Sequence, residues 1–108
     1  MYLKCVEGDI RFNTDDIILI ESDKHRNLII MRNNSIFHIY CKLDDLELIL
    51  SEYGFIRVHK SYLVNLRHMI RLCNYKLTLD NNMTIRVPRG RYRYVKSKFC
   101  CNDIDDNR

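Results

Sequence analysis

The chain has 108 residues, of which 46% are hydrophobic and 30% charged, with three Gly, one Pro and a formal net charge of +4. This length and mixture predict one folded domain with its own core, and they exclude a disordered, collagen-like or linker-like chain. No apolar run approaches the roughly 20 residues of a membrane span and the N-terminus lacks a signal peptide's apolar stretch, so we expect a cytoplasmic protein that engages no membrane.

Three short strands are predicted in the first half of the chain. Residues Asp16–Glu21 form an apolar run typical of a buried strand, and Asn27–Arg32 form a second one after a polar break at Ser22–Arg26. The Asn-Asn pair at 33–34 predicts a turn, because asparagine tolerates a positive φ angle. The chain then returns in a third strand, Ser35–Tyr40.

A helix is predicted over Lys42–Tyr53. Apolar residues recur there at helical spacing, and acidic residues gather early, where the helix dipole stabilises negative charge. Gly54 suits the position just after a helix end, because glycine accepts left-handed backbone angles.

The segment FIRVHKSYLVN at positions 55–65 joins a strand to a polar end. Phe55, Arg57 and His59 alternate with Ile56 and Val58, which is the period-2 pattern of a half-buried strand, and Lys60 and Ser61 follow where such a strand stops. Asn65 closes the apolar stretch behind them. We predict that its amide satisfies backbone groups at a tight turn rather than contacting a ligand.

A second hairpin is predicted further along, with strands at Tyr75–Leu79 and Met83–Val87 and a turn at Asp80–Asn82. A second, shorter helix is expected after Pro88. Three of its side chains are expected to face inward: Tyr92, Val95 and Phe99.

No linker divides the chain. We therefore expect one domain over residues 1–100, followed by an acidic, flexible tail over residues 101–108.

Motifs of enzymes and of metal sites are missing from the sequence. It contains no phosphate-binding loop, no dinucleotide fingerprint, no H-E-x-x-H and no nucleophile elbow. The five Cys form no C-x-x-C pair. We therefore predict a protein that is not an enzyme, with no catalytic residue, metal or cofactor, whose cysteines are small buried hydrophobic residues or free surface thiols.

Charge is distributed unevenly along the chain. Residues 1–54 hold 6 Lys/Arg against 10 Asp/Glu, whereas residues 55–100 hold 11 Lys/Arg against the single Asp80. Such a basic half favours a polyanionic partner, because phosphate neutralisation and counterion release supply most non-specific affinity. A basic face that only keeps the protein in solution is the plainer alternative.

Three clusters of hydrogen-bond donors fall in predicted loops or at element ends, where a β scaffold can hold side chains outward. The first cluster lies in the break between two strands: Lys24, His25, Arg26 and Asn27. The second cluster lies at the end of the Phe55–His59 strand: Arg57, His59, Lys60 and Ser61. The third cluster surrounds a Pro and a Gly where hairpin passes into helix: Arg86, Arg89 and Arg91.

These residues resemble a known family. The pattern F-x-R-x-H-[RK]-S-[YF]-x-V-N is met at positions 55–65, and the ending I-x-V-x-R-x-x-Y at positions 85–92. Together with DIILIES and LDDLELIL, these motifs resemble the LytTR-type DNA-binding domain of many bacterial response regulators, over roughly Gly8 to Cys100. The resemblance implies an elongated β-sandwich of two or three small antiparallel sheets, with one or two short helices.

The resemblance also implies a function. Members of this family are transcription regulators of two-component systems, whose loops enter two successive major grooves of double-stranded DNA. By position, the base-reading residues would be Lys24–Asn27, Lys60 and Arg89. This chain departs from the family pattern at Pro88 and Arg86, which stand where a small residue and a Pro are usual. The implied partner is a pair of direct DNA repeats, bound by a monomer or weak dimer.

A module that binds RNA or a protein through the same basic half is the alternative. Readers of single-stranded RNA display stacking aromatic rings on an exposed sheet face. Most Tyr and Phe of this chain fall at positions predicted to face inward, which favours a duplex.

Overall fold

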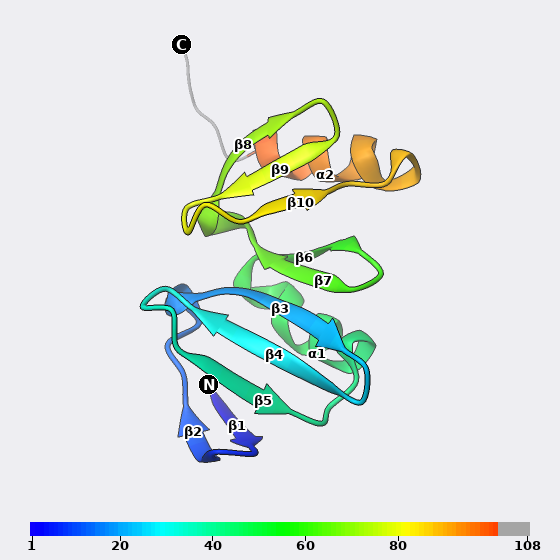
Figure 1. Cartoon of the computed structure of the whole chain (residues 1–108). Helices are drawn as coiled ribbons and strands as arrows, with labels where there is room; N and C mark the ends of the chain where they lie inside the picture. The colour runs from blue at the N-terminus through cyan, green and yellow to red at the C-terminus, as the bar shows by residue number, and fades with distance from the viewer. Residues whose placement is uncertain (102–108) are drawn as a thin grey trace.

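The computed structural model describes residues 1–101, which form ten strands, two α-helices and three short 3-10 helices (Figure 1). Paired strands run antiparallel, in one sheet of five strands, one of three and one of two. The molecule is elongated, with principal extents of 45 × 26 × 25 Å. The prediction of a mostly β fold with small antiparallel sheets and short helices is confirmed.

The five-stranded sheet forms the centre of the molecule, with the order β5-β4-β3-β7-β6. Its strands are β3 (Ile17–Asp23), β4 (Arg26–Met31), β5 (Ile36–Ile39), β6 (Phe55–His59) and β7 (Tyr62–Asn65). One face packs against α1 (Leu43–Leu50) and the hairpin of β1 (Tyr2–Cys5) and β2 (Gly8–Arg11). The other packs against α2 (Arg89–Cys101) and the sheet of β8 (Met69–Cys73), β9 (Lys76–Leu79) and β10 (Thr84–Arg86).

The strands β3, β6 and β7 of the central sheet are therefore buried on both faces, between two hydrophobic cores. Ile20, Leu46 and Leu63 lie in the core beneath α1, and Leu19, Val58 and Leu77 lie in the core beneath the three-stranded sheet. All six side chains are fully buried. Each such side chain stabilises the fold by about 1.5–3 kcal/mol relative to an exposed position.

A β-bulge explains the uninterrupted apolar run of β3. The pairing of β3 with β4 shifts between Ile17 and Leu19, so the extra residue Ile18 joins Leu19 on one face, while Ile17 and Ile20 face the other. Sequence periodicity alone predicts one buried strand here, and the bulge shows how that strand serves two cores.

Burial on both faces also corrects the prediction for Phe55–His59. Phe55, Ile56 and Val58 are all buried, so β6 is not a half-buried strand. Its pairing with β7 shifts between Arg57 and His59. Arg57 lies on the α1 side of the sheet, as Phe55 does, by regular alternation, and the bulge at Val58 then moves His59 to the opposite face, where it pairs with Tyr62.

The helices differ from their predicted lengths. The helix predicted over Lys42–Tyr53 divides into α1 and the 3-10 helix η2 (Ser51–Tyr53), and Gly54 then takes the expected left-handed conformation with φ of 84°. The second helix, predicted to be the shorter one, is the longer of the two α-helices, with 13 residues against 8. It includes Cys101, and the acidic tail beyond it lies outside the described residues.

Two asparagines cap 3-10 helices that lead into strands. Asn13 accepts from the N–H of Asp15 at η1 (Thr14–Asp16), and Asn65 accepts from the N–H of Arg67 at η3 (Leu66–His68). The buried amide of Asn65 also donates to the carbonyls of Thr14 and Ile17, at 3.2 and 3.0 Å. The predicted structural role of Asn65 is confirmed.

The cysteines follow both predicted environments. Cys5 is buried and Cys41 half-buried, and burial raises the pKa of both thiols. Cys73, Cys100 and Cys101 are exposed, and all five are free thiols. Within residues 1–101, no helix has the length and apolar character needed to cross a membrane.

Hydrogen bonds between Glu7 and His38 attach the N-terminal hairpin to β5. The Glu7 carboxylate accepts from the His38 N–H at 2.9 Å and contacts the His38 ring nitrogen Nδ1 at 2.5 Å. The backbone N–H, and then the ring, lower the pKa of Glu7 from 4.5 to about 2.

This pair makes stability depend on pH. A carboxyl whose pKa is lowered in the folded state stabilises the fold above its unfolded pKa, and that contribution disappears as the pH falls through the folded pKa. Wild type should therefore be more stable than Glu7→Gln at neutral pH, and the difference should vanish between pH 5 and about pH 2. Urea unfolding of both proteins between pH 7 and pH 2 measures this difference in stability. A difference that stays constant with pH would show that it comes from packing instead.

Candidate nucleic-acid interface

The three predicted clusters lie along one long edge of the molecule. The β3–β4 turn, the β6–β7 turn and the β10–α2 junction all project at the right of Figure 1. Successive hairpins of antiparallel sheets bring these segments to the same side, although they are far apart in the sequence.

Hydrogen bonds hold the three segments together. The N–H of Ser22, before the first cluster, donates to the carbonyl of Ser61 in the second cluster at 2.8 Å. The guanidinium of Arg91, in the third cluster, donates to the carbonyl of Arg57 at 3.0 Å. The edge is therefore one connected surface rather than three independent loops.

The first cluster divides between surface and interior. Lys24, His25 and Arg26 are exposed at the turn, where Lys24 adopts a left-handed φ of 51°. Asn27 is only 5% exposed, and its amide donates to the carbonyl of Cys41. The prediction that Asn27 contacts DNA is therefore not supported by its position, because it anchors the segment between β5 and α1 instead.

The second cluster is built around Arg57, whose side chain is only 11% exposed. Its guanidinium forms ion pairs with Asp44 and Glu47 of α1, at 2.8 and 2.9 Å. It also donates to the carbonyls of His59 and Lys60, at 3.0 and 2.6 Å. Four acceptors within the protein thus bind the Arg57 guanidinium, so this side chain stabilises the β6–β7 turn.

His59 also supports the turn. Its Nδ1 accepts from the N–H of Ser61 at 3.0 Å, and its ring lies 5.4 Å from that of Tyr62. Lys60, at the tip, is the exposed cation of this cluster. Of the four predicted residues here, Lys60 has the position best suited to meet a ligand.

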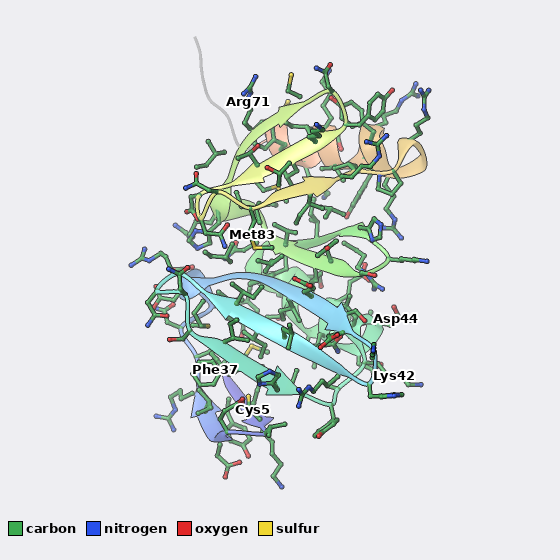
Figure 2. All side chains as sticks on the ribbon, in the orientation of Figure 1. Cys5, Phe37, Lys42, Asp44, Arg71 and Met83 are labelled. Carbon is green, nitrogen blue, oxygen red and sulfur yellow. The ribbon has the colours of Figure 1, made fainter. Side chains whose placement is uncertain are left out.

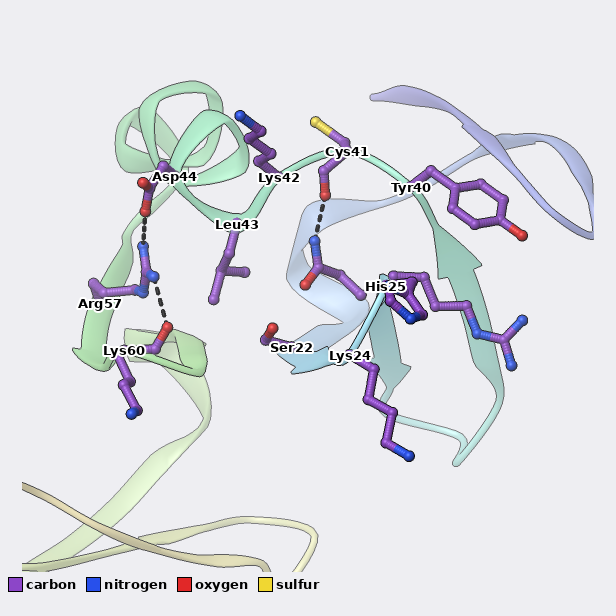
Figure 3. A pocket seen from close by; sticks show the side chains of 12 residues that line it. Ser22, Lys24, His25, Tyr40, Cys41, Lys42, Leu43, Asp44, Arg57 and Lys60 are labelled. Atoms are coloured by element: carbon purple, nitrogen blue, oxygen red, sulfur yellow. Dashed lines mark hydrogen bonds and ion pairs between the residues drawn. The ribbon is translucent and has the colours of Figure 1, made fainter.

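A groove of about 290 Å³ connects the first two clusters (Figure 3). Lys24 and Lys60 extend toward the same side of it, and Arg57 lies between α1 and the Lys60 turn. Lys42, just before α1, also lines the groove. Sequence reasoning missed Lys42, because nothing in its neighbourhood indicates that the β5–α1 connection meets the other two loops.

The third cluster depends on an aromatic contact. The Arg89 guanidinium lies 5.3 Å from the centroid of the Tyr75 ring, and that ring lies 4.4 Å from the ring of Tyr92. The N–H of Val87 donates to the Tyr75 carbonyl at 2.8 Å. Tyr75, which the sequence analysis placed in a strand, therefore supports both the backbone and the side chain of the β10–α2 junction.

Tyr75 occupies this position with a strained backbone. It and Asn74 form the two-residue β8–β9 turn, with φ angles of 62° and 52°. Two positive φ angles in succession define a turn that favours Asn or Gly, and a bulky residue there costs about 1–2 kcal/mol.

Ion pairing separates two kinds of cation in the described part of the chain. Arg32, Arg57 and Arg67 pair with carboxylates. No such pair within residues 1–101 involves the exposed cations of the edge: Lys24, Arg26, Lys42, Lys60, Arg86, Arg89 and Arg91. The cations of the edge thus remain available to an external anion.

The aromatic residues only partly follow their predicted inward positions. All four Phe and three of the seven Tyr are buried or half-buried, but Tyr2, Tyr40, Tyr53 and Tyr94 are exposed. These four lie on separate elements and form no stacking platform on one sheet. Residues 1–101 also contain no group of three or more His, Cys, Asp or Glu side chains that could hold a metal.

Comparison with known proteins identifies the family. The model of the LytTr DNA-binding domain matches residues 7–99. The chain belongs to the LytTr DNA-binding domain family. This membership supports DNA binding in transcription regulation as its general function, and it points away from an enzyme.

A solved structure has the same fold. It is the LytTr DNA-binding domain of a protein described as a methyl-accepting/DNA response regulator from Bacillus cereus, with a TM-score of 0.76 and 20% sequence identity. The match covers 93% of this chain and 95% of the other. No curated protein matches the sequence.

The Tyr75 contact predicts how this LytTr domain responds to mutation. Tyr75→Asn should relieve backbone strain but remove the contacts of the ring with Arg89 and Tyr92, so these opposing effects should leave the free energy of unfolding within about 1–2 kcal/mol of wild type, while preference for a selected duplex over random DNA falls. Tyr75→Phe keeps the ring and should preserve that preference. Chemical denaturation and duplex titration measure the two quantities. Full preference in Tyr75→Asn would show that the ring does not position Arg89.

Proposed function

We propose that this LytTr domain is the sequence-specific double-stranded DNA-binding part of a bacterial response regulator, and that its edge loops enter successive major grooves. The observation that carries this proposal is the single connected edge, on which three loops present cations that pair with no carboxylate of residues 1–101. Family membership indicates DNA as the general partner, and the edge indicates which surface of the domain would bind it.

The dimensions of the molecule suit a duplex. Successive major grooves on one side of B-DNA lie about 34 Å apart, and the long axis measures 45 Å. The molecule is therefore long enough to lie along one helical turn of the duplex. The β3–β4 and β6–β7 turns, whose Lys24 and Lys60 line one groove of the protein, would then meet one major groove, and the β10–α2 junction would meet the next.

The side chains suit base reading as well as phosphate binding. Arg89 can donate two hydrogen bonds to guanine, and Lys24 and Lys60 can donate to guanine acceptors or to phosphate oxygens. The Arg89 side chain is held by Tyr75, and the backbone at Lys60 is held by Arg57, which lowers the entropic cost of ordering these segments on DNA. We further propose binding as a monomer or weak dimer, with direct repeats each occupied by one copy.

The RNA- or protein-binding alternative receives less support. Single-stranded nucleic acid is held mainly by stacked aromatic rings, and the exposed Tyr residues are scattered over several elements. Titration of single-stranded RNA beside a duplex tests this directly. Preference for the single strand would overturn the duplex proposal.

The proposal predicts a separation of base discrimination from general affinity. On a duplex selected from a random library, Lys60→Ala and Arg89→Ala should each lose roughly 1–3 kcal/mol, with much less loss on random DNA. Wild-type affinity should fall steeply as salt rises, because several phosphates are neutralised.

Arg32→Ala is the matched control, because Arg32 follows β4 at the end remote from the β3–β4 turn and pairs with Asp16. Its affinity should remain within about twofold of wild type, because it makes no phosphate contact. Thermal unfolding of each variant identifies losses caused by instability. Equal losses of Lys60→Ala and Arg89→Ala on both DNAs would make these residues phosphate contacts only.

A further inference from the structure

The outer face of the β8–β9–β10 sheet carries a second basic surface, which shares only Arg86 with the three loop clusters. Its inner face packs Leu77, Leu79 and Ile85 into the second core, so the alternate residues point to solvent. We propose that this outer face binds the phosphate backbone of duplex flanking the site that the edge loops read, an inference that rests on the proposed function.

Strand register arranges the outer face as two rows of three residues. One row is Arg71, Thr78 and Thr84, and the other is Cys73, Lys76 and Arg86. Side chains directly opposite each other on paired strands lie within about 5.5 Å at their Cβ atoms. Three cations and two hydroxyl groups are thereby gathered on one small sheet.

This surface has the chemistry of a phosphate site. A hollow of about 300 Å³ opens between Arg71, Lys76 and the two threonines, with Asn74 at its rim. Each of these side chains can donate to a phosphate oxygen. Asp80, the one carboxylate in residues 55–100, is bonded to the buried ring of His68 at 2.6 Å instead.

Like charges placed side by side on a sheet destabilise it unless an anion neutralises them. Arg86 and Lys76 are directly opposed, and no described carboxylate pairs with Arg71, Lys76 or Arg86. These three cations lie outside the hydrophobic core, and a bound polyanion would remove the repulsion between their charges. A stacking or apolar partner fits poorly, because neither row contains an aromatic residue.

Arg86 connects this face to the edge. It belongs to the third cluster, three residues before Arg89, and to the second row of the sheet. Arg71 stands at the top of the molecule in Figure 2, whereas Lys42, in the groove of the first two clusters, lies at the lower right. A duplex lying along the edge therefore reaches the outer face only where it extends past the third cluster and bends toward the sheet.

The test compares duplexes that share one selected site. The short duplex holds the site alone, and two long duplexes extend it on the side of the third cluster or on the side of the first cluster. Wild type should bind the third-cluster extension about five- to tenfold tighter than the short duplex, because additional phosphates are neutralised. Extension on the other side should add much less.

The variant is the double substitution Arg71→Gln and Lys76→Gln. It should bind the short duplex within about twofold of wild type, lose the gain from the third-cluster extension, and reduce the salt dependence on that duplex by about two phosphates. Lys4→Gln with Arg11→Gln removes the same charge from the β1–β2 hairpin and should keep the gain. All four substituted residues are exposed, so these variants should stay folded, and circular dichroism verifies the fold.

The outcomes separate this inference from the proposed function. If wild type shows no preference for the selected site over random duplex, the proposed function fails. If that preference is present but extension adds nothing, or the Arg71/Lys76 variant keeps the gain, the outer face does not bind flanking DNA. Equal losses of the variant on short and long duplexes would likewise overturn the inference, because these residues would then act within the site itself.

Discussion

The buried guanidinium of Arg57 is the interaction on which the candidate interface depends. It connects α1, through Asp44 and Glu47, to the carbonyls of the β6–β7 turn. The Arg57 carbonyl in turn accepts from Arg91 at the start of α2. A nearly buried charge is costly unless its donors are satisfied, so the turn, the helix and the strand must keep their mutual geometry. One side chain thus fixes where Lys60 projects.

The central sheet makes that geometry rigid. Because β3, β6 and β7 are buried on both faces, the turns at their ends extend from strands that cannot shift without disturbing two cores. The bulge at Ile18 adapts the apolar run of β3 to this double burial. Loops on such a scaffold lose little conformational entropy when they bind. Their fixed geometry favours discrimination between DNA sequences, whereas adaptable loops favour non-specific contact.

Much of the fold could be predicted from the sequence, because its strongest strands are apolar runs separated by polar turns. The strands β3, β4 and β5 and the β9–β10 hairpin were predicted within a few residues. The β1–β2 hairpin was missed, because its strands have four residues each and are mostly exposed. The strand β8 was missed as well, since its bulge at Ile70 disturbs the alternation on which the prediction relies.

The site was predictable only in part. The sequence identifies potential hydrogen-bond donors. Burial decides which of these donors are available to a ligand, and burial depends on partners that are distant in the sequence. Arg57 pairs with residues 10 and 13 positions earlier, and Asn27 bonds to a carbonyl 14 positions later. Tyr75, in contrast, contributes to the site although the sequence did not predict it. Its role arises from a left-handed turn and two ring contacts that no local pattern indicates.

The most direct test of the account is an NMR titration of isotope-labelled protein with a selected duplex. Shifts should concentrate in the β3–β4 turn, at Lys60 and at the β10–α2 junction, while the Arg57 Nε–H stays protected from exchange because its internal acceptors are retained. Shifts centred on α1 or on the β1–β2 hairpin, or an Arg57 Nε–H that leaves its partners for DNA, would contradict the account.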